Sequence, residues 1–162
     1  MVKLEVLGVH NDGQQRHAWV LLRHEDRVLP IVVGEHEAGA IHEALIHRNV
    51  GRPMTHDLIC NLLAGLRGQL KSLVIYKLEN DTFYAHLNIE QMNASGAVEQ
   101  VLRVDSRPSD GIAVALRVDS PIYAAEAVMD QAAQPLAILG SSEEGPSDEG
   151  DDADPDEPEF EE

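Results

Sequence analysis

The sequence has few of the features that mark secreted, membrane-spanning or disulfide-stabilised proteins. It has one cysteine in 162 residues, Cys60, which excludes an intrachain disulfide and fits a reducing compartment. Its apolar runs are much shorter than the roughly 20 residues that cross a membrane. The first ten residues, MVKLEVLGVH, show no basic leader followed by an apolar run. We therefore expect a soluble, cytoplasmic protein without a membrane partner.

Several well-known catalytic and cofactor motifs are also missing from the sequence. It contains no P-loop, no G-x-G-x-x-G, no G-x-S-x-G and no C-x-x-C pattern. Nucleotide-cofactor chemistry and mechanisms with a serine or cysteine nucleophile therefore have no motif to support them.

Basic residues are scarce, with 12 Lys and Arg against 29 Asp and Glu and a net charge of −17. The last 22 residues, 141–162, hold twelve of these acids and no Lys or Arg. The remaining chain has 17 acids against the 12 bases and shows no basic stripe of the kind that binds nucleic acid. A protein of this composition that acts on phosphodiesters needs a local basic pocket, a metal ion, or both.

The chain divides into one domain and a tail. Residues 141–162 carry one large apolar side chain, Phe160, so the segment 139–162 cannot bury enough surface to offset the entropy lost on ordering. We predict a disordered acidic tail there. Residues 1–138 are enough for a single compact domain with its own core.

Hydrophobic periodicity and turn residues predict seven strands and four helices. The strands are expected at 2–10, 17–23, 28–33, 70–78, 82–90, 98–104 and 122–123, and the helices at 35–48, 55–66, 108–117 and 124–133. Antiparallel hairpins interrupted by helices indicate an α+β fold with mostly antiparallel sheet.

Two details of this pattern make further predictions. The run VLPIVV at 28–33 is almost continuously apolar, which is typical of a central strand, but Pro30 favours a strand end or a bulge. In the second helix, Leu58, Leu62 and Leu66 lie one above another.

The densest polar stretch is Asp105–Gly111, where a strand is expected to end and a helix to begin. Every residue there has a structural explanation: Pro108 suits a first helical turn, the two serines can cap it, and Asp110 meets the positive end of the helix dipole. The same set also suits chemistry, because a helix N-terminus beside Arg107 can bind an anion and two carboxylates can hold a divalent cation.

A second stretch, Arg52–Asp57, has a similar composition. Thr55 is expected to cap the helix that follows, with Asp57 in its first turn. His56 is not needed to start a helix, and it can serve as an acid, a base or a metal ligand. If the two Arg-Pro turns meet in space, they form a cluster suited to metal-assisted phosphoryl hydrolysis.

Four ordered motifs resemble the bifunctional nuclease domain family over roughly residues 2–133. They are LPIVVG with Glu37-Ala38, then Arg52-Pro-x-Thr55-His56-Asp57-Leu58, then Thr82-Phe83-Tyr84-Ala85, then Asp105-x-Arg107-Pro108-Ser109-Asp110-Gly111-Ile112-Ala113. At Gly111 this sequence departs from the alanine usual in the family, and we expect little consequence.

The resemblance implies a compact α+β domain that self-associates and hydrolyses DNA and RNA. It also implies a polar pocket formed by the matching residues, which are Glu37, Arg52, Thr55, His56, Asp57, Asp105, Arg107, Ser109 and Asp110.

We therefore hypothesise a nuclease that depends on Mg²⁺ or Mn²⁺. Its expected catalytic residues are His56, Asp57, Asp105 and Asp110, the three aspartates being also the expected metal ligands. Phosphate is expected to bind Arg52, Thr55, Arg107 and Ser109, with Glu37 as a further pocket residue. The alternative is a non-catalytic module in which the same pocket binds an anion or a partner's acidic segment.

Overall fold

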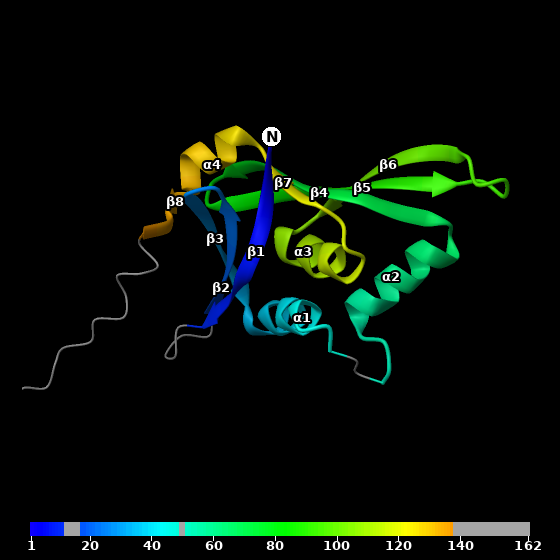
Figure 1. Cartoon of the computed structure of the whole chain (residues 1–162), viewed down its shortest axis with the longest axis horizontal. Helices are drawn as coiled ribbons and strands as arrows, with labels where there is room; N and C mark the ends of the chain where they lie inside the picture. The colour runs from blue at the N-terminus through cyan, green and yellow to red at the C-terminus, as the bar shows by residue number, and fades with distance from the viewer. Residues whose placement is uncertain (12–16, 49–50, 138–162) are drawn as a thin grey trace, which may run out of the picture.

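The computed structural model describes residues 1–11, 17–48 and 51–137. The predicted acidic tail lies outside these residues. The described chain forms an eight-stranded sheet with four helices, which confirms the α+β prediction (Figure 1).

The strands lie in the spatial order β6-β5-β4-β7-β1-β2-β3-β8. Every neighbouring pair is antiparallel except β4 and β7, which are parallel. The strands are β1 Val2–Asn11, β2 His17–His24, β3 Arg27–Gly34, β4 Gly68–Glu79, β5 Thr82–Met92, β6 Val98–Ser106, β7 Ile122–Ala124 and β8 Gln134–Pro135. All seven predicted strands are present, and β8 adds a short pairing that the sequence pattern does not reveal.

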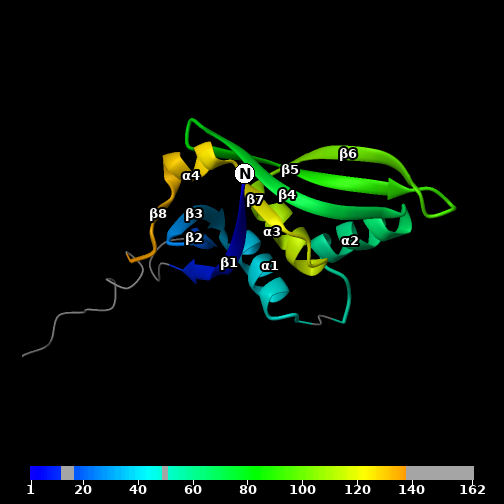
Figure 2. The ribbon, with the colours of Figure 1, turned by 45° about the horizontal axis from the view of Figure 1, so that its top comes forward.

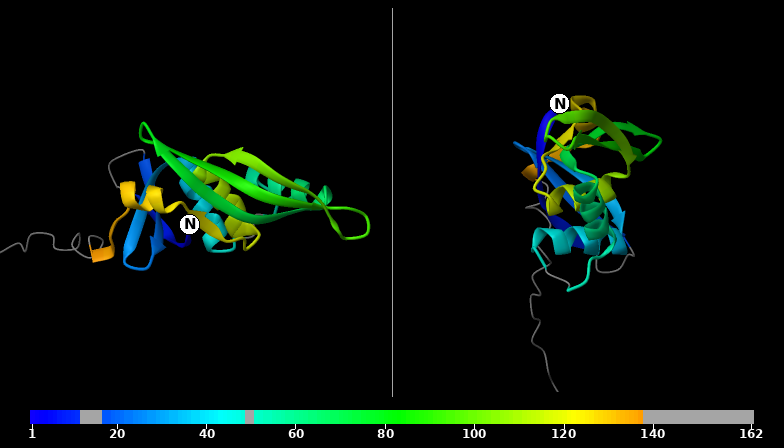
Figure 3. Two further views of the ribbon diagram at one scale, coloured as in Figure 1. Left: turned by 90° about the horizontal axis from the view of Figure 1, so that it is seen from above. Right: turned by 90° about the vertical axis from the view of Figure 1, so that its right-hand side faces the viewer.

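The helices are α1 Glu35–Leu45, α2 Thr55–Gly65, α3 Pro108–Arg117 and α4 Glu126–Ala132. The first three lie together on one side of the sheet, with α3 between α1 and α2, while α4 packs against β3 and β4 (Figure 2). Strands β4 to β6 form a long arm that extends past the end of α2 (Figure 3).

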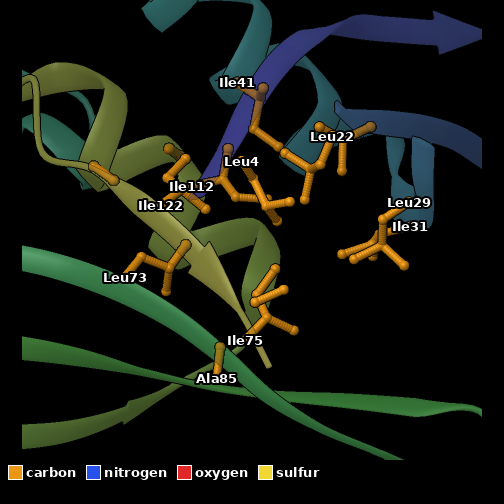
Figure 4. Close-up of a cluster of buried hydrophobic side chains, with 14 of the residues drawn as sticks. Leu4, Leu22, Leu29, Ile31, Ile41, Leu73, Ile75, Ala85, Ile112 and Ile122 are labelled. Carbon is orange, nitrogen blue, oxygen red and sulfur yellow. The ribbon is translucent and has the colours of Figure 1, made fainter. Parts of the chain in front are cut away.

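One apolar cluster joins α3 to the sheet and to α1. Ile112 of α3 packs with Leu4, Ile41, Leu73 and other fully buried aliphatic side chains (Figure 4). Seven of the ten residues of α3 are buried. This burial fixes the position of the first turn of α3, where the polar stretch begins.

Strand β3 differs from its prediction at Pro30. The strand continues through this residue without a bulge, and Pro30 lies opposite Leu21 in a regular ladder. On the other side of β3, β8 pairs only with Arg27 and Val28. Within the described residues Pro30 is therefore next to an open strand edge, where a missing N–H is tolerated.

Helix α2 is the least buried of the three helices that lie together. Ile59 and Leu63 are partly buried against the core, but Leu58, Leu62 and Leu66 are 51%, 56% and 65% exposed. An apolar stripe on a helix normally faces the core, so this stripe requires a separate explanation. Within the described part of the chain, no helix has the length and hydropathy to span a membrane.

Candidate functional site

The two Arg-Pro turns each start a helix, as predicted, but the caps differ in detail. In α3, Arg107 is the N-cap and Pro108 occupies the first turn, where its missing N–H costs no helical bond. In α2 the N-cap is Met54, so the prediction that Thr55 caps this helix is wrong. The Asp57 carboxylate accepts a hydrogen bond of 2.8 Å from the Met54 N–H, and this bond replaces the expected cap.

The structure brings the two turns together. The Nε2 atom of His56, in the first turn of α2, lies 3.1 Å from Oδ1 of Asp110, in the first turn of α3. Arg107 Nε donates to the other oxygen of Asp110 at 2.8 Å, and its Nη1 lies 3.1 Å from Oε1 of Glu37 in α1. A network of charged and polar side chains therefore connects the N-terminal turns of three helices.

The ionisation of Asp110 reflects this position. Partial burial acts to raise the pKa of the Asp110 carboxyl, but hydrogen bonds from Arg107 and His56 outweigh it and hold the pKa below the ordinary value of 3.8. Asp110 is therefore an anion at neutral pH, placed to orient the imidazole of His56.

Arg117 lies below these turns and ties the three helices together. Its Nε donates to Asp57 at 2.7 Å, and its Nη1 donates to the backbone carbonyls of Ala40 at 3.0 Å and Ala113 at 2.9 Å. The Arg117 side chain is only 11% exposed. The hydrogen bond from Arg117, with the bond from Met54, lowers the pKa of Asp57. Nothing in the sequence singles out Arg117, because a basic residue in the last turn of a helix is ordinary.

An open pocket of about 680 Å³ lies over this polar chain. It is lined by residues of all three helices: Glu35, His36, Glu37, Gly39, Ala40, Glu43, Met54, Thr55, His56, Ile59, Arg107, Asp110 and Arg117. Four of the thirteen are carboxylates and two are arginines, so the pocket is not a simple basic anion site. Among the ion-paired side chains, that of Arg107 is 65% exposed and open to a ligand.

Of the nine residues predicted to form the pocket, five line it, namely Glu37, Thr55, His56, Arg107 and Asp110. The other four lie outside the lining. Asp57 is bonded to Arg117 and the Met54 N–H, Ser109 is buried in the first turn of α3, and Arg52 is exposed in the bend before α2.

Asp105 is the predicted site residue whose position in the structure differs most from its prediction. Strand β6 continues through it, and it pairs with His86 of β5. Residues directly opposite in an antiparallel pair share a face of the sheet. His86 alternates with Ala85 and Leu87, which are buried on the side of α3. The Asp105 side chain therefore points to the opposite face from the pocket.

The carboxylates of the described residues do not form a ready ligand set for a divalent cation. No group of three or more His, Cys, Asp or Glu side chains in this part of the chain is arranged to hold a metal ion. Asp57 and Asp110 are each already in an ion pair with an arginine. A metal held by Asp110 and Glu37 would have to displace Arg107 from these two carboxylates.

The family model for the bifunctional nuclease domain matches residues 20–137, and the chain belongs to this family. A relative from Mycobacterium tuberculosis strain H37Rv, named "Uncharacterized protein Rv1829", is 41% identical over 148 residues, which cover 89% of this chain and 82% of the relative.

Plant proteins of the family are more distant. "Bifunctional nuclease 1" of Oryza sativa subsp. japonica is 26% identical over 113 residues, 68% of this chain and 33% of the rice protein. "Bifunctional nuclease 1" of Arabidopsis thaliana is 24% identical over 118 residues, 71% of this chain and 35% of that protein. The match thus covers about a third of each plant protein.

Proposed function

We propose that this protein is a nuclease that hydrolyses phosphodiester bonds at the pocket between the N-terminal turns of α1, α2 and α3. The observation that carries the proposal is the contact between His56 and Asp110, which joins in one pocket two of the four motifs that resemble the family. The names of the plant relatives support hydrolysis of nucleic acid as the reaction class.

The roles follow from position and chemistry. Arg107 is the exposed cation at the pocket and presents a planar set of donors to a phosphate group. His56 is the one imidazole held by a carboxylate there, so it would move the proton, and Asp110 would orient it. Thr55 adds a hydroxyl to the pocket wall. Glu37 holds Arg107 from the other side.

The expected Mg²⁺ or Mn²⁺ stays a prediction. Because the pocket is lined by Glu35, Glu37, Glu43 and Asp110, a polyanionic substrate meets more negative than positive charge there. A divalent cation would reduce this repulsion. The described carboxylates do not form a ready ligand set, so we assign no step of the reaction to a metal.

One observation favours the alternative of a non-catalytic binding module. The Asp110 carboxylate uses both oxygens on protein partners, one with His56 and the other with Arg107. In such a module this network is structural, and the exposed Arg107 binds an anionic group without hydrolysis.

The test is hydrolysis of labelled DNA and RNA by the highly purified full chain, with and without EDTA. The nuclease proposal expects cleavage that travels with the protein through every purification step and falls at least about a hundredfold in His56→Gln. Absence of cleavage by the wild type, with retained binding of an oligonucleotide that Arg107→Gln abolishes, favours the binding module instead.

Asp105→Asn asks whether the opposite face of the sheet takes part. Activity equal to that of the wild type leaves the reaction to the pocket. A loss comparable with that of His56→Gln would return Asp105 to the catalytic role predicted from sequence.

A further inference from the structure

Strand β6 is an edge strand, and its outer side has no partner strand among the described residues. Eight of its nine residues are exposed, and it contains no proline, glycine or lysine that would block pairing with another strand. Its register with β5 is regular from Gln100 to Ser106 and irregular only near Met92. Residues 100–106 therefore offer a regular edge to a further strand.

The two faces of this edge differ in chemistry. Leu102 and Val104 pair with Ile89 and Leu87 of β5, whose side chains are buried on the side of the helices. Leu102 and Val104 therefore lie on the helix side, and both are exposed. On the other face, Arg103 and Asp105 pair with Asn88 and His86.

Helix α2 places a second apolar surface on the same side of the sheet (Figure 2). Its stripe of Leu58, Leu62 and Leu66 is more than half exposed at every position. With Leu102 and Val104 it makes five aliphatic side chains that the described residues do not cover. Apolar side chains left exposed on one side of a sheet are typical of an interaction site.

We propose that β6 and the α2 leucine stripe form a two-fold interface with a second copy of this chain. The charges on β6 support this occupant. When two copies of β6 pair as antiparallel strands about a two-fold axis perpendicular to the sheet, each residue lies opposite a residue whose side chain is on the same face. With Val104 opposite its own copy, Arg103 lies opposite the partner's Asp105, and Asp105 lies opposite the partner's Arg103.

Neighbouring registers are less favourable. Pairing centred on Arg103 places two guanidinium groups opposite each other. Pairing centred on Leu102 places Arg103 opposite the partner's Val101 and leaves Asp105 without a partner residue on the regular edge, so no opposite charges pair. Like charges directly opposite destabilise a sheet, so the charge pattern selects the register centred on Val104.

The leucine stripe fits the same symmetry. An axis perpendicular to the sheet keeps its faces, so both copies of α2 lie on one side of the continuous sheet. Leu58, Leu62 and Leu66 then lie on the same side of the continuous sheet as Leu102, Val104 and their symmetry mates, and the dimer removes part of this apolar surface from water. The interface does not rest on the proposed hydrolysis and stands or falls separately from it. It gives the self-association expected from the family resemblance a defined surface.

The test is the mass of the full chain in solution, measured by sedimentation equilibrium over a range of concentrations. The wild type is expected at twice the 17.8 kDa of one chain. Asp105→Arg puts guanidinium groups opposite each other at both pairs and is expected to raise the dimer Kd at least about tenfold. The double variant Arg103→Asp/Asp105→Arg restores two opposite-charge pairs and is expected to restore the dimer.

Two further variants separate this interface from a general loss of folding. Leu62→Asp, at an exposed position, is expected to weaken the dimer while circular dichroism stays unchanged. Arg23→Asp reverses a charge in an exposed ion pair on β2 and is the matched control, expected to leave the dimer intact. A monomeric wild type, a dimer that resists both Asp105→Arg and Leu62→Asp, or a double variant that stays monomeric would overturn the proposal.

Discussion

The Nε2 atom of His56 lies 3.1 Å from Oδ1 of Asp110, although the two residues are 54 positions apart in the chain. This contact joins the first turn of α2 to the first turn of α3 and makes one pocket from two sequence motifs. Arg107 donates a hydrogen bond to the other carboxylate oxygen of Asp110. The proposed function rests on this arrangement.

Acid should weaken the fold through Asp57. Arg117 and the Met54 N–H lower the pKa of the Asp57 carboxyl in the folded state. The ionised carboxylate therefore contributes fully to stability at a pH above its unfolded-state pKa. This contribution is lost as the pH falls through the lower, folded-state pKa. We expect the free energy of unfolding in urea to fall as pH drops below about 4. The fall should be shallower in Asp57→Asn, and an unchanged slope would contradict this assignment.

Removing Arg117 should cost more than removing an exposed arginine. Arg117→Met leaves Asp57 without its cationic partner and removes the side-chain donor from two backbone carbonyls, in a largely buried position. We expect a loss of about 2–4 kcal/mol in the free energy of unfolding. Arg23→Met, which breaks an exposed pair with Glu5, is the control and should cost less than about 1 kcal/mol. Equal losses in the two variants would show that Arg117 is not a structural anchor.

Gly111→Ala should destabilise the protein, contrary to the small effect expected from sequence. A Cβ at Gly111 would lie 2.4 Å from Cδ1 of Leu73, which is fully buried. Overpacking of this kind costs about 1–3 kcal/mol, whereas the gain in helix propensity from Gly to Ala is about 1 kcal/mol. We expect a net loss on thermal unfolding. Leu73→Val removes the clashing atom, so the double variant should be more stable than the sum of the single effects predicts.

Metal binding should compete with Arg107. If Mg²⁺ or Mn²⁺ binds Asp110 and Glu37, it must share these carboxylates with the Arg107 guanidinium. Arg107→Ala should therefore raise the affinity for Mn²⁺ in calorimetry, while Arg52→Ala, whose residue lies outside the pocket lining, should not. Nuclease activity of the wild type is expected to be lost in EDTA and restored by Mn²⁺. Mn²⁺ binding that is identical in the wild type and Arg107→Ala would place the metal elsewhere.

The parts of the fold that sequence predicts well are those with strong local signals. Helix α3 begins at Pro108 and ends at Arg117 as predicted, because proline in the first turn and the apolar spacing both mark it. The effect of Pro30 is harder to predict, because a proline interrupts strand pairing unless it lies beside an open strand edge. That edge is known only from the structure. Hydrophobic periodicity does not predict the exposure of the α2 stripe, because it identifies the apolar side of a helix but not the element that covers that side.

The site shows the same division. His56, Arg107 and Asp110 could be selected because their types and positions suit chemistry and match a family motif. The sequence groups Asp105 with them because it predicts that the strand ends at residue 104. Two further residues of strand carry the Asp105 side chain to the opposite face. Arg117 is recognised only from its three long-range bonds, which no local pattern encodes.

We propose that hydrolysis takes place in the pocket joined by Asp110. The most direct test is the single-turnover rate of cleavage of a labelled oligonucleotide by Asp110→Asn beside Asp81→Asn. The control makes the same change in the β4–β5 turn, where the positive φ of Asp81 also suits asparagine. We predict a loss of at least about a hundredfold in Asp110→Asn and a wild-type rate in Asp81→Asn. An Asp110→Asn enzyme that cleaves at the wild-type rate would contradict the account.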